Sequence, residues 1–188
     1  IISFDKPKFL RPIILQFSIQ TIFEKCDIPN SQQQQREDGG TIMDFVIPSL
    51  EAYSTMPDQV INIECQTTLK DRFRLTTGKS TDARIKRYLA TATGCGLVTQ
   101  KDVNDFSIEK VKEIIINNNV TLVVFDDVKS NIIEKIRTAY DKAVSEDATS
   151  ASAIELQNLL RLSGNKIVSY KELISRDIKS ILVYWENA

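Results

Sequence analysis

A short apolar run, Val120 to Phe125, limits what this chain can fold into more than any other feature of its sequence. The run follows three consecutive asparagines and is almost continuous, as expected for a buried β-strand. Helical patterns occur both before and after it along the chain. The combination predicts helices layered on a sheet, and it does not fit a repeat array.

Apolar residues recur at helical spacing in several stretches. The spacing i, i+3, i+4, i+7 is typical of a helix that buries one face. It predicts a first helix that ends near Pro29, a helix capped by Ser107, and a last helix that opens with the capping box of Ser169 and Glu172. The apolar stripes before the last helix are Ile19, Ile22, Phe23 and Cys26; Ile85, Tyr88, Leu89 and Ala92; Val111, Ile114 and Ile115; and Ile132, Ile133, Ile136 and Tyr140.

Two further strands are predicted, over residues 41–47 and 60–66, and the polar segments 30–40 and 146–152 are predicted as loops. Side chains on a strand alternate between its two faces. In the second strand Ile61, Ile63 and Cys65 therefore share one face, and Asn62, Glu64 and Gln66 share the other. The order of elements predicts an α/β fold, with a central mixed sheet flanked by helices.

Composition excludes several enzyme classes. The chain has 188 residues, of which 42% are apolar, enough for one globular domain with or without a small appendage. It contains no His, which excludes Ser-His-Asp hydrolysis, Cys-His proteolysis and zinc sites built on imidazole. Catalysis must therefore use carboxylates, amides, Lys, Arg, Tyr or Cys.

Cysteine content and hydropathy bear on where the protein works. The three cysteines lack any CxxC spacing, which argues against a disulfide or zinc framework and favours a cytoplasmic location. No apolar run approaches the roughly 20 residues that cross a bilayer, so no membrane partner is expected. The chain begins at Ile1, which indicates a fragment or a processed piece.

Positive charge is concentrated between Lys70 and Arg87, although the whole chain is close to neutral. The stretch holds seven cations against two acids, which is typical of a surface that faces phosphate groups. The alternative is a solvated helix face. Residues 78–80 resemble the end of a phosphate-binding loop, but Phe73 stands where that loop requires glycine, so no nucleotide cofactor is expected.

The candidate catalytic group consists of Asp44, Glu64 and Gln66. Asp44 lies on one predicted strand, Glu64 and Gln66 lie on the polar face of the next, and the nineteen residues between the carboxylates leave room for a hairpin. Two carboxylates on neighbouring strands make a hard oxygen site suited to Mg²⁺, which a phosphodiesterase uses to activate water and to neutralise charge on the phosphate. The alternative is a pair of solvent-facing charges at a sheet edge.

The adjacent string 66–74, Gln-Thr-Thr-Leu-Lys-Asp-Arg-Phe-Arg, resembles the catalytic domain of EcoRII-type restriction endonucleases, in the PD-(D/E)xK nuclease superfamily. The family has a Lys-Thr-Thr run, then Lys-Asp-Arg, an aromatic residue and Arg. Residues 19–28 are similar to its first helix, residues 43–49 to its Pro-Asp-Phe-x-x-Pro-Ser strand, and residues 88–124 to its Leu-Leu-Thr to Leu-Val-Val region. The resemblance covers about residues 10 to 140.

The resemblance implies a type II site-specific deoxyribonuclease of a restriction-modification system. It places the catalytic residues at Asp44, Glu64 and Gln66, and the Mg²⁺ ligands at Asp44 and Glu64. It also implies a nuclease core over residues 1–143 that includes a DNA-recognition segment at 66–90. Residues 144–188 are expected to form a helical extension packed on that core.

The chain differs from the family at positions that the family uses for catalysis. Gln66 stands where the family has its catalytic Lys, and Met43 replaces the usual Pro. Gln66 cannot supply positive charge to the developing phosphorane, although its amide can orient a water, and some active enzymes of the superfamily carry Glu-x-Gln. The family displaces its second metal-binding Glu onto the following helix, where this chain has Lys79, whereas Glu64 fills the ordinary acidic position.

Lys70, Asp71 and Arg72 alternate donor, acceptor and donor, which suits the major-groove edges of G·C pairs. In the family this triplet reads CC:GG steps, so the resemblance implies a short G·C-containing palindrome read by a homodimer on double-stranded DNA. The alternative is a salt-bridged helix turn. The expected contacts with the DNA backbone are Arg74, Lys79, Arg84 and Lys86.

Two other functions stay open on the sequence. One is a nuclease-fold DNA-binding module that has lost catalysis, or whose catalytic Lys was changed to Gln. The other is an interaction domain in which the acidic pair is incidental. Binding without cleavage would select the first, and failure to bind any duplex at low salt would select the second.

Overall fold

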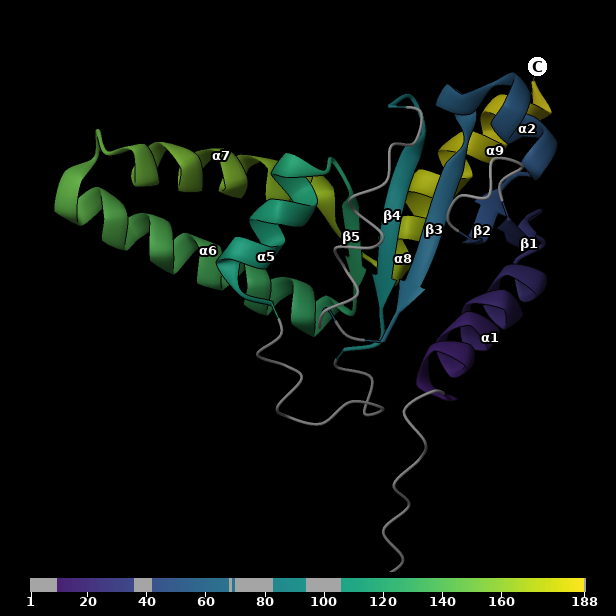
Figure 1. Cartoon of the computed structure of the whole chain (residues 1–188), viewed down its shortest axis with the longest axis horizontal. Coiled ribbons are helices and arrows are strands. Elements are labelled where there is room, and N and C mark those ends of the chain that lie inside the picture. Colours follow the sequence, from purple (N-terminus) through teal and green to yellow (C-terminus); the bar gives the residue numbers. More distant parts are fainter. Residues whose placement is uncertain (1–9, 36–41, 68, 70–82, 94–105, 188) are drawn as a thin grey trace, which may run out of the picture.

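A computed structural model of the chain shows an α/β fold built on one mixed six-stranded sheet (Figure 1). The structure describes residues 10–35, 42–67, 69, 83–93 and 106–187. The strands lie side by side in sequence order: β1 (Ser31–Gln35), β2 (Ile42–Ile47), β3 (Ile61–Gln66), β4 (Lys86–Thr91), β5 (Thr121–Val124) and β6 (Ile167–Ser169). β1 to β3 pair antiparallel and β3 to β6 pair parallel, which confirms the predicted fold class.

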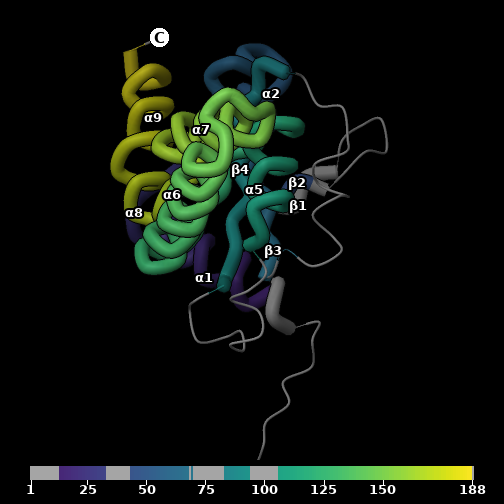
Figure 2. The backbone as a smooth tube through the Cα atoms, turned by 90° about the vertical axis from the view of Figure 1, so that its left-hand side faces the viewer, coloured from purple at the N-terminus to yellow at the C-terminus, as the bar shows by residue number. Residues whose placement is uncertain are grey.

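Helices cover both faces of the sheet. One face carries α1 (Leu10–Lys25), α8 (Tyr170–Glu172), η3 (Leu173–Ile178) and α9 (Lys179–Glu186). The other carries α5 (Ile108–Lys112), η2 (Glu113–Asn117), α6 (Asp126–Asp147) and α7 (Ala151–Lys166). α2 (Leu50–Thr55) and η1 (Pro57–Gln59) join β2 to β3. The long helices α6 and α7 run side by side and project from the side of the sheet where β5 and β6 lie (Figures 1 and 2).

The core is divided between the two faces by strand alternation. On β4, Tyr88 and Ala90 pack toward α1 and the C-terminal helices, whereas Leu89 packs toward α5, α6 and α7. All three side chains are buried. Because both faces of the parallel strands are covered, their sequences read as apolar runs and not as polar–apolar alternation.

Several predicted elements are confirmed. β2, β3, β5 and α6 occur where the sequence indicated. The hydroxyl of Ser107 accepts a hydrogen bond from the amide N–H of Lys110 at 3.3 Å and caps α5. The capping box forms as well, because Ser169 and Glu172 each accept a hydrogen bond from the other's amide N–H.

The prediction of a helix around Ile85 to Ala92 is wrong, because this stretch forms β4. The spacing of its apolar residues matches a helix, but the same residues are buried between β3 and β5 in the sheet. A strand that is buried on both faces does not alternate between polar and apolar residues. The spacing of its apolar residues therefore cannot distinguish a strand from a helix.

The polar segment 30–40 was expected to be a loop, yet residues 31–35 form β1. This edge strand pairs with β2 from Ser31–Val46 to Gln35–Ile42. Its backbone hydrogen bonds to β2, and not apolar burial, define the strand, so hydropathy did not reveal it.

The C-terminal segment contributes to the sheet as well as to the helices. Residues 144–188 were expected to be helical, but Ile167–Ser169 form β6, which pairs parallel with β5. The loop expected at 146–152 shrinks to residues 148–150, because α6 and α7 extend into it. The domain boundary at residue 143 stays a prediction. In the described part of the chain, no helix is long and apolar enough to cross a membrane.

Candidate active site

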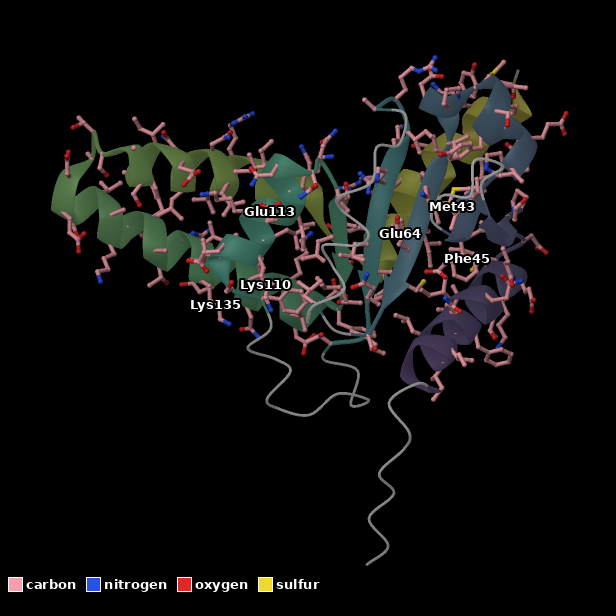
Figure 3. The ribbon with its side chains drawn as sticks, in the orientation of Figure 1. Met43, Phe45, Glu64, Lys110, Glu113 and Lys135 are labelled. Carbon is pink, nitrogen blue, oxygen red and sulfur yellow. The ribbon has the colours of Figure 1, made fainter. Side chains whose placement is uncertain are left out.

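The register of β2 and β3, extended by one residue, puts Asp44 and Glu64 at facing positions on neighbouring strands, and their role in catalysis stays a prediction. β2 and β3 run antiparallel with Phe45 opposite Ile63, so the next position along each strand is Asp44 on β2 and Glu64 on β3. Figure 3 labels Glu64 on β3, with Phe45 and Met43, the chain neighbours of Asp44, on the adjacent strand. The hairpin through α2 and η1 therefore brings together two carboxylates that lie far apart in the sequence.

Hydrogen bonds fix the carboxylate of Asp44 from two elements. Its Oδ2 accepts a hydrogen bond from the amide N–H of Cys65 at 2.6 Å, and its Oδ1 accepts one from Nε2 of Gln16 on α1. Asp44 is partly buried, and burial raises the pKa of this carboxyl even though both hydrogen bonds lower it. The site thus holds its negative charge in a setting that disfavours charge, a feature common in functional sites.

Glu64 is buried, with only 8% of its surface exposed. It shares a face of β3 with Asn62, which is 2% exposed, and it pairs with Leu89 on β4. An ionised carboxylate is costly to bury unless a partner or a metal ion compensates its charge. The alternative of two solvent-facing charges at a sheet edge is therefore wrong, because Glu64 lies in the interior of an inner strand.

Cys65 reports on both carboxylates at once. Burial raises the pKa of the Cys65 thiol well above its ordinary value, and the negative charges of Asp44 and Glu64 raise it further. Both carboxylates lie beside Cys65, because Glu64 precedes it in β3 and its amide N–H donates to Asp44. This thiol stays protonated and buried, so it takes the role of a core side chain and not of a nucleophile.

Gln66 ends β3 beside Thr91 of β4 and is partly buried. Strand alternation puts its side chain on the same face of β3 as Glu64. The predicted trio thus consists of a facing carboxylate pair and an amide two residues farther along the strand.

Gln16 is the site residue that the sequence prediction missed. It precedes Ile19 by three positions and Phe23 by seven, so it lies on the face of α1 that packs on the sheet. A polar side chain on a buried helix face was the available signal. No local pattern, however, connects that position to a strand residue 28 positions later.

The predicted recognition residues mostly lie outside the described part of the chain; these are Lys70, Asp71, Arg72, Arg74 and Lys79. Arg84 and Lys86 are described and exposed. Lys86 begins β4 opposite Ile61, whereas Glu64 pairs with Leu89, three residues on. At about 3.3 Å per residue, Lys86 is thus offset from the carboxylate row by about 10 Å along the strand.

The carboxylate pair fits a magnesium ion. Mg²⁺ is usually held by one or two carboxylates, with water and substrate phosphate oxygens completing its shell. Within the described residues, no group of three or more His, Cys, Asp or Glu side chains is placed to hold a metal ion. Asp44 and Glu64 supply the carboxylate oxygens that such a site uses.

Comparison with known proteins supports the fold. No family model and no curated protein matches the sequence. The structure is similar to that of the restriction endonuclease PspGI in complex with substrate DNA, with a TM-score of 0.67 and 16% identity over 90% of this chain and 60% of that one. It is also similar to metal-depleted Ecl18kI in complex with uncleaved DNA, with a TM-score of 0.59 and 18% identity over 92% of this chain and 46% of that one.

The chain spans about half to three fifths of the length of these two enzymes. The similarity covers nearly all of the chain, including the mixed sheet and the helices on both of its faces. The protein therefore has the fold of restriction endonucleases.

Proposed function

We propose that this chain is a Mg²⁺-dependent, sequence-specific endonuclease of the type II restriction class, which hydrolyses double-stranded DNA at a short G·C-containing palindrome. The observation that carries the proposal is the buried Glu64 facing Asp44 on inner strands of a restriction-endonuclease fold. Two structures of similar fold hold DNA, one of them described as substrate DNA.

The proposed hydrolysis assigns a separate role to each of a few residues. Asp44 and Glu64 would hold the metal ion, which when bound would neutralise charge on the phosphate and make a water molecule more acidic. Gln16 and the amide N–H of Cys65 keep the carboxylate of Asp44 in one orientation. The carbonyl oxygen of Gln66 accepts a hydrogen bond from the attacking water and orients it toward the phosphorus.

Specificity belongs to the segment between β3 and β4. Lys70 and Arg72 donate to guanine and Asp71 accepts from cytosine. The contacts with the DNA backbone come from Arg74, Lys79, Arg84 and Lys86. A palindromic site calls for a two-fold symmetric protein, so the active form is a homodimer.

The competing function is a DNA-binding module without nuclease activity. Its support is Gln66, which stands where the resemblance places a catalytic Lys. Such a module binds duplex DNA with or without Mg²⁺ and leaves it intact.

The carboxylate pair is tested by replacing either member. Asp44→Ala and Glu64→Ala each leave one metal ligand and should lower cleavage by at least about 10³-fold, while DNA binding stays the same or tightens as repulsion toward phosphate is removed. Asp141→Ala, an exposed carboxylate on α6, is the matched control. Single-turnover cleavage and gel-shift binding should be measured together. Cleavage near the wild-type rate by either variant rules out the assigned site.

The base-reading role is tested at Arg72. Arg72→Ala should cost about 1–3 kcal/mol on the cognate duplex and relax discrimination at one G·C pair. Arg74→Ala is the control, because losing a phosphate contact weakens binding to all sequences alike. Competition between cognate and single-mismatch duplexes measures the difference. Equal losses on both duplexes for Arg72→Ala would remove its role in specificity.

A further inference from the structure

A second charged site lies where β4 and β5 begin, several residues along the strands from the carboxylate pair. A pocket of about 400 Å³ opens where β4 and β5 begin and where α7 ends, in front of β6. Its charged lining consists of Arg84, Lys86, Arg87, Lys166, Arg176 and Asp177. Five cations thus surround the pocket with a single carboxylate among the residues that line it.

The carboxylate of Asp177 already accepts hydrogen bonds from neighbouring side chains. Oδ1 of Asp177 accepts a hydrogen bond from Nε of Arg176 at 2.6 Å, and its Oδ2 accepts hydrogen bonds from Nη2 of Arg176 at 3.2 Å and from the hydroxyl of Tyr88 at 3.0 Å. Arg176 therefore compensates the charge of Asp177. Lys86 and Lys166 add positive charge to the lining, and an anion entering the pocket would meet a field that favours it.

Lys166 is a cation of this lining that is partly withdrawn from water. It is partly buried at the end of α7, and its ammonium donates to the backbone carbonyl of Asn119 at 3.4 Å, beyond the usual range for a strong hydrogen bond. Burial lowers the pKa of Lys166. An anionic oxygen beside this ammonium would offset its desolvation better than a distant carbonyl does.

We propose that this pocket binds a phosphate group, with Lys166 and Lys86 as its principal donors. Phosphate carries the multiple acceptor oxygens that several converging Lys and Arg donors can satisfy at once. The volume exceeds what a free phosphate ion fills, which leaves room for a group that carries it.

The pocket is separate from the carboxylate site. Lys86 pairs with Ile61 whereas Glu64 pairs with Leu89, three residues on, which corresponds to about 10 Å of strand. Gln66 pairs with Thr91 at the far end of these strands, and Figure 1 shows β3 and β4 running side by side from that end to the end where Lys86 lies. The inference therefore does not depend on nuclease activity.

The test is an NMR titration of the ¹⁵N-labelled full chain with three probes at constant ionic strength: inorganic phosphate, adenosine 5′-monophosphate and a short DNA duplex. The expected result is a saturable shift of the amide signals of Asn119, Thr121 and Asn165, which sodium chloride does not cause. Saturation by phosphate or the nucleotide identifies a free phosphate carrier as the ligand. Saturation by the duplex alone identifies DNA phosphates as the source.

Substitutions in the pocket test whether the shift of the amide signals arises from binding there. Lys166→Gln and Lys86→Gln should each weaken binding by roughly tenfold, because each removes one charge-assisted contact. Lys179→Gln, an exposed cation on α9 outside the pocket, should bind like the wild type. Dispersed spectra of all variants confirm that they are folded. The proposal is overturned if none of the three probes gives a saturable shift, or if both pocket variants bind as tightly as Lys179→Gln.

Discussion

Asp44 is held by a helix and a strand together. Gln16 binds one oxygen from α1, the amide N–H of Cys65 binds the other from β3, and burial raises the pKa of the carboxyl despite both contacts. The hydrogen bonds fix the direction in which the carboxylate points. A metal ion is the partner that would compensate the remaining cost of its charge.

The sequence predicted the members of the site that share a strand pattern. Glu64 and Gln66 could be placed on one face of β3 by alternation, and Asp44 could be placed on the neighbouring strand. Gln16 could not be found in this way, because its contact depends on how α1 packs against the sheet. Packing between distant elements leaves no local period in the sequence.

Substitutions at position 66 test whether the chain is an active nuclease or an inactive DNA-binding module. If the amide of Gln66 orients the attacking water, Gln66→Ala should slow single-turnover cleavage about 10²-fold or more with little change in DNA affinity. If a Lys was lost here, the present chain is inert and Gln66→Lys should raise cleavage by orders of magnitude, since it restores a cation beside the phosphorane. Equal rates for the Gln, Ala and Lys forms would show that this position takes no part in the chemistry.

At the level of elements, strands buried on both faces were the hardest to predict. β5 was recognised because its apolar run is short and follows three asparagines, whereas β4 carries Lys and Arg at its start and apolar residues at helical spacing. β6 has three residues, too few to show any period. For β4 and β6, pairing with β5 supplies the information that their own sequences lack.

The capping box that begins the C-terminal helices should make stability depend on pH. Glu172 accepts hydrogen bonds from the ammonium of Lys129 at 2.6 and 2.7 Å and from the amide N–H of Ser169 at 2.7 Å. Burial acts to raise the pKa of Glu172, but these contacts outweigh it and lower the pKa below its ordinary value of 4.5. The ionised form therefore stabilises the fold above that value, and this stabilisation is lost as pH falls through the lowered pKa.

Glu172→Gln should accordingly lower the free energy of unfolding by about 1 kcal/mol at neutral pH, with the difference shrinking in acid. Urea denaturation across the pH range measures it. Glu134→Gln is the control, because the exposed pair of Glu134 with Arg137 at 3.6 Å should contribute less than about 0.5 kcal/mol. A loss for Glu172→Gln that is the same at every pH would contradict the ionic origin.

Gly164 offers a stabilising substitution in α7. It is exposed near the end of the helix, and a Cβ added there would meet no atom within 4 Å. Gly164→Ala should raise the free energy of unfolding by about 0.5–1 kcal/mol, because alanine loses less backbone entropy on forming a helix. Gly164→Val should gain less, since a β-branched side chain is restricted in a helix. Thermal or urea unfolding gives the ranking, and a destabilised alanine variant would contradict it.

On the scale of the whole molecule, β3 and β4 run from a cationic pocket to a carboxylate pair. The pocket collects residues from β4, β5, α7 and η3, and the carboxylates come from β2 and β3. The layered α/β arrangement could be predicted from the alternation of strand and helix patterns. The return of the C-terminus to add β6 and to cover the α1 face could not, because that closure depends on tertiary packing.

The central claim is that this fold cuts DNA at a defined sequence by means of Asp44 and Glu64. The most direct measurement is incubation of the purified chain with unmethylated phage DNA in Mg²⁺, followed by sequencing of every fragment end. We predict discrete ends that share one short G·C-containing palindrome, and their disappearance in EDTA and with Asp44→Ala. Intact DNA, ends scattered without a common sequence, or the same ends produced by Asp44→Ala would contradict the claim.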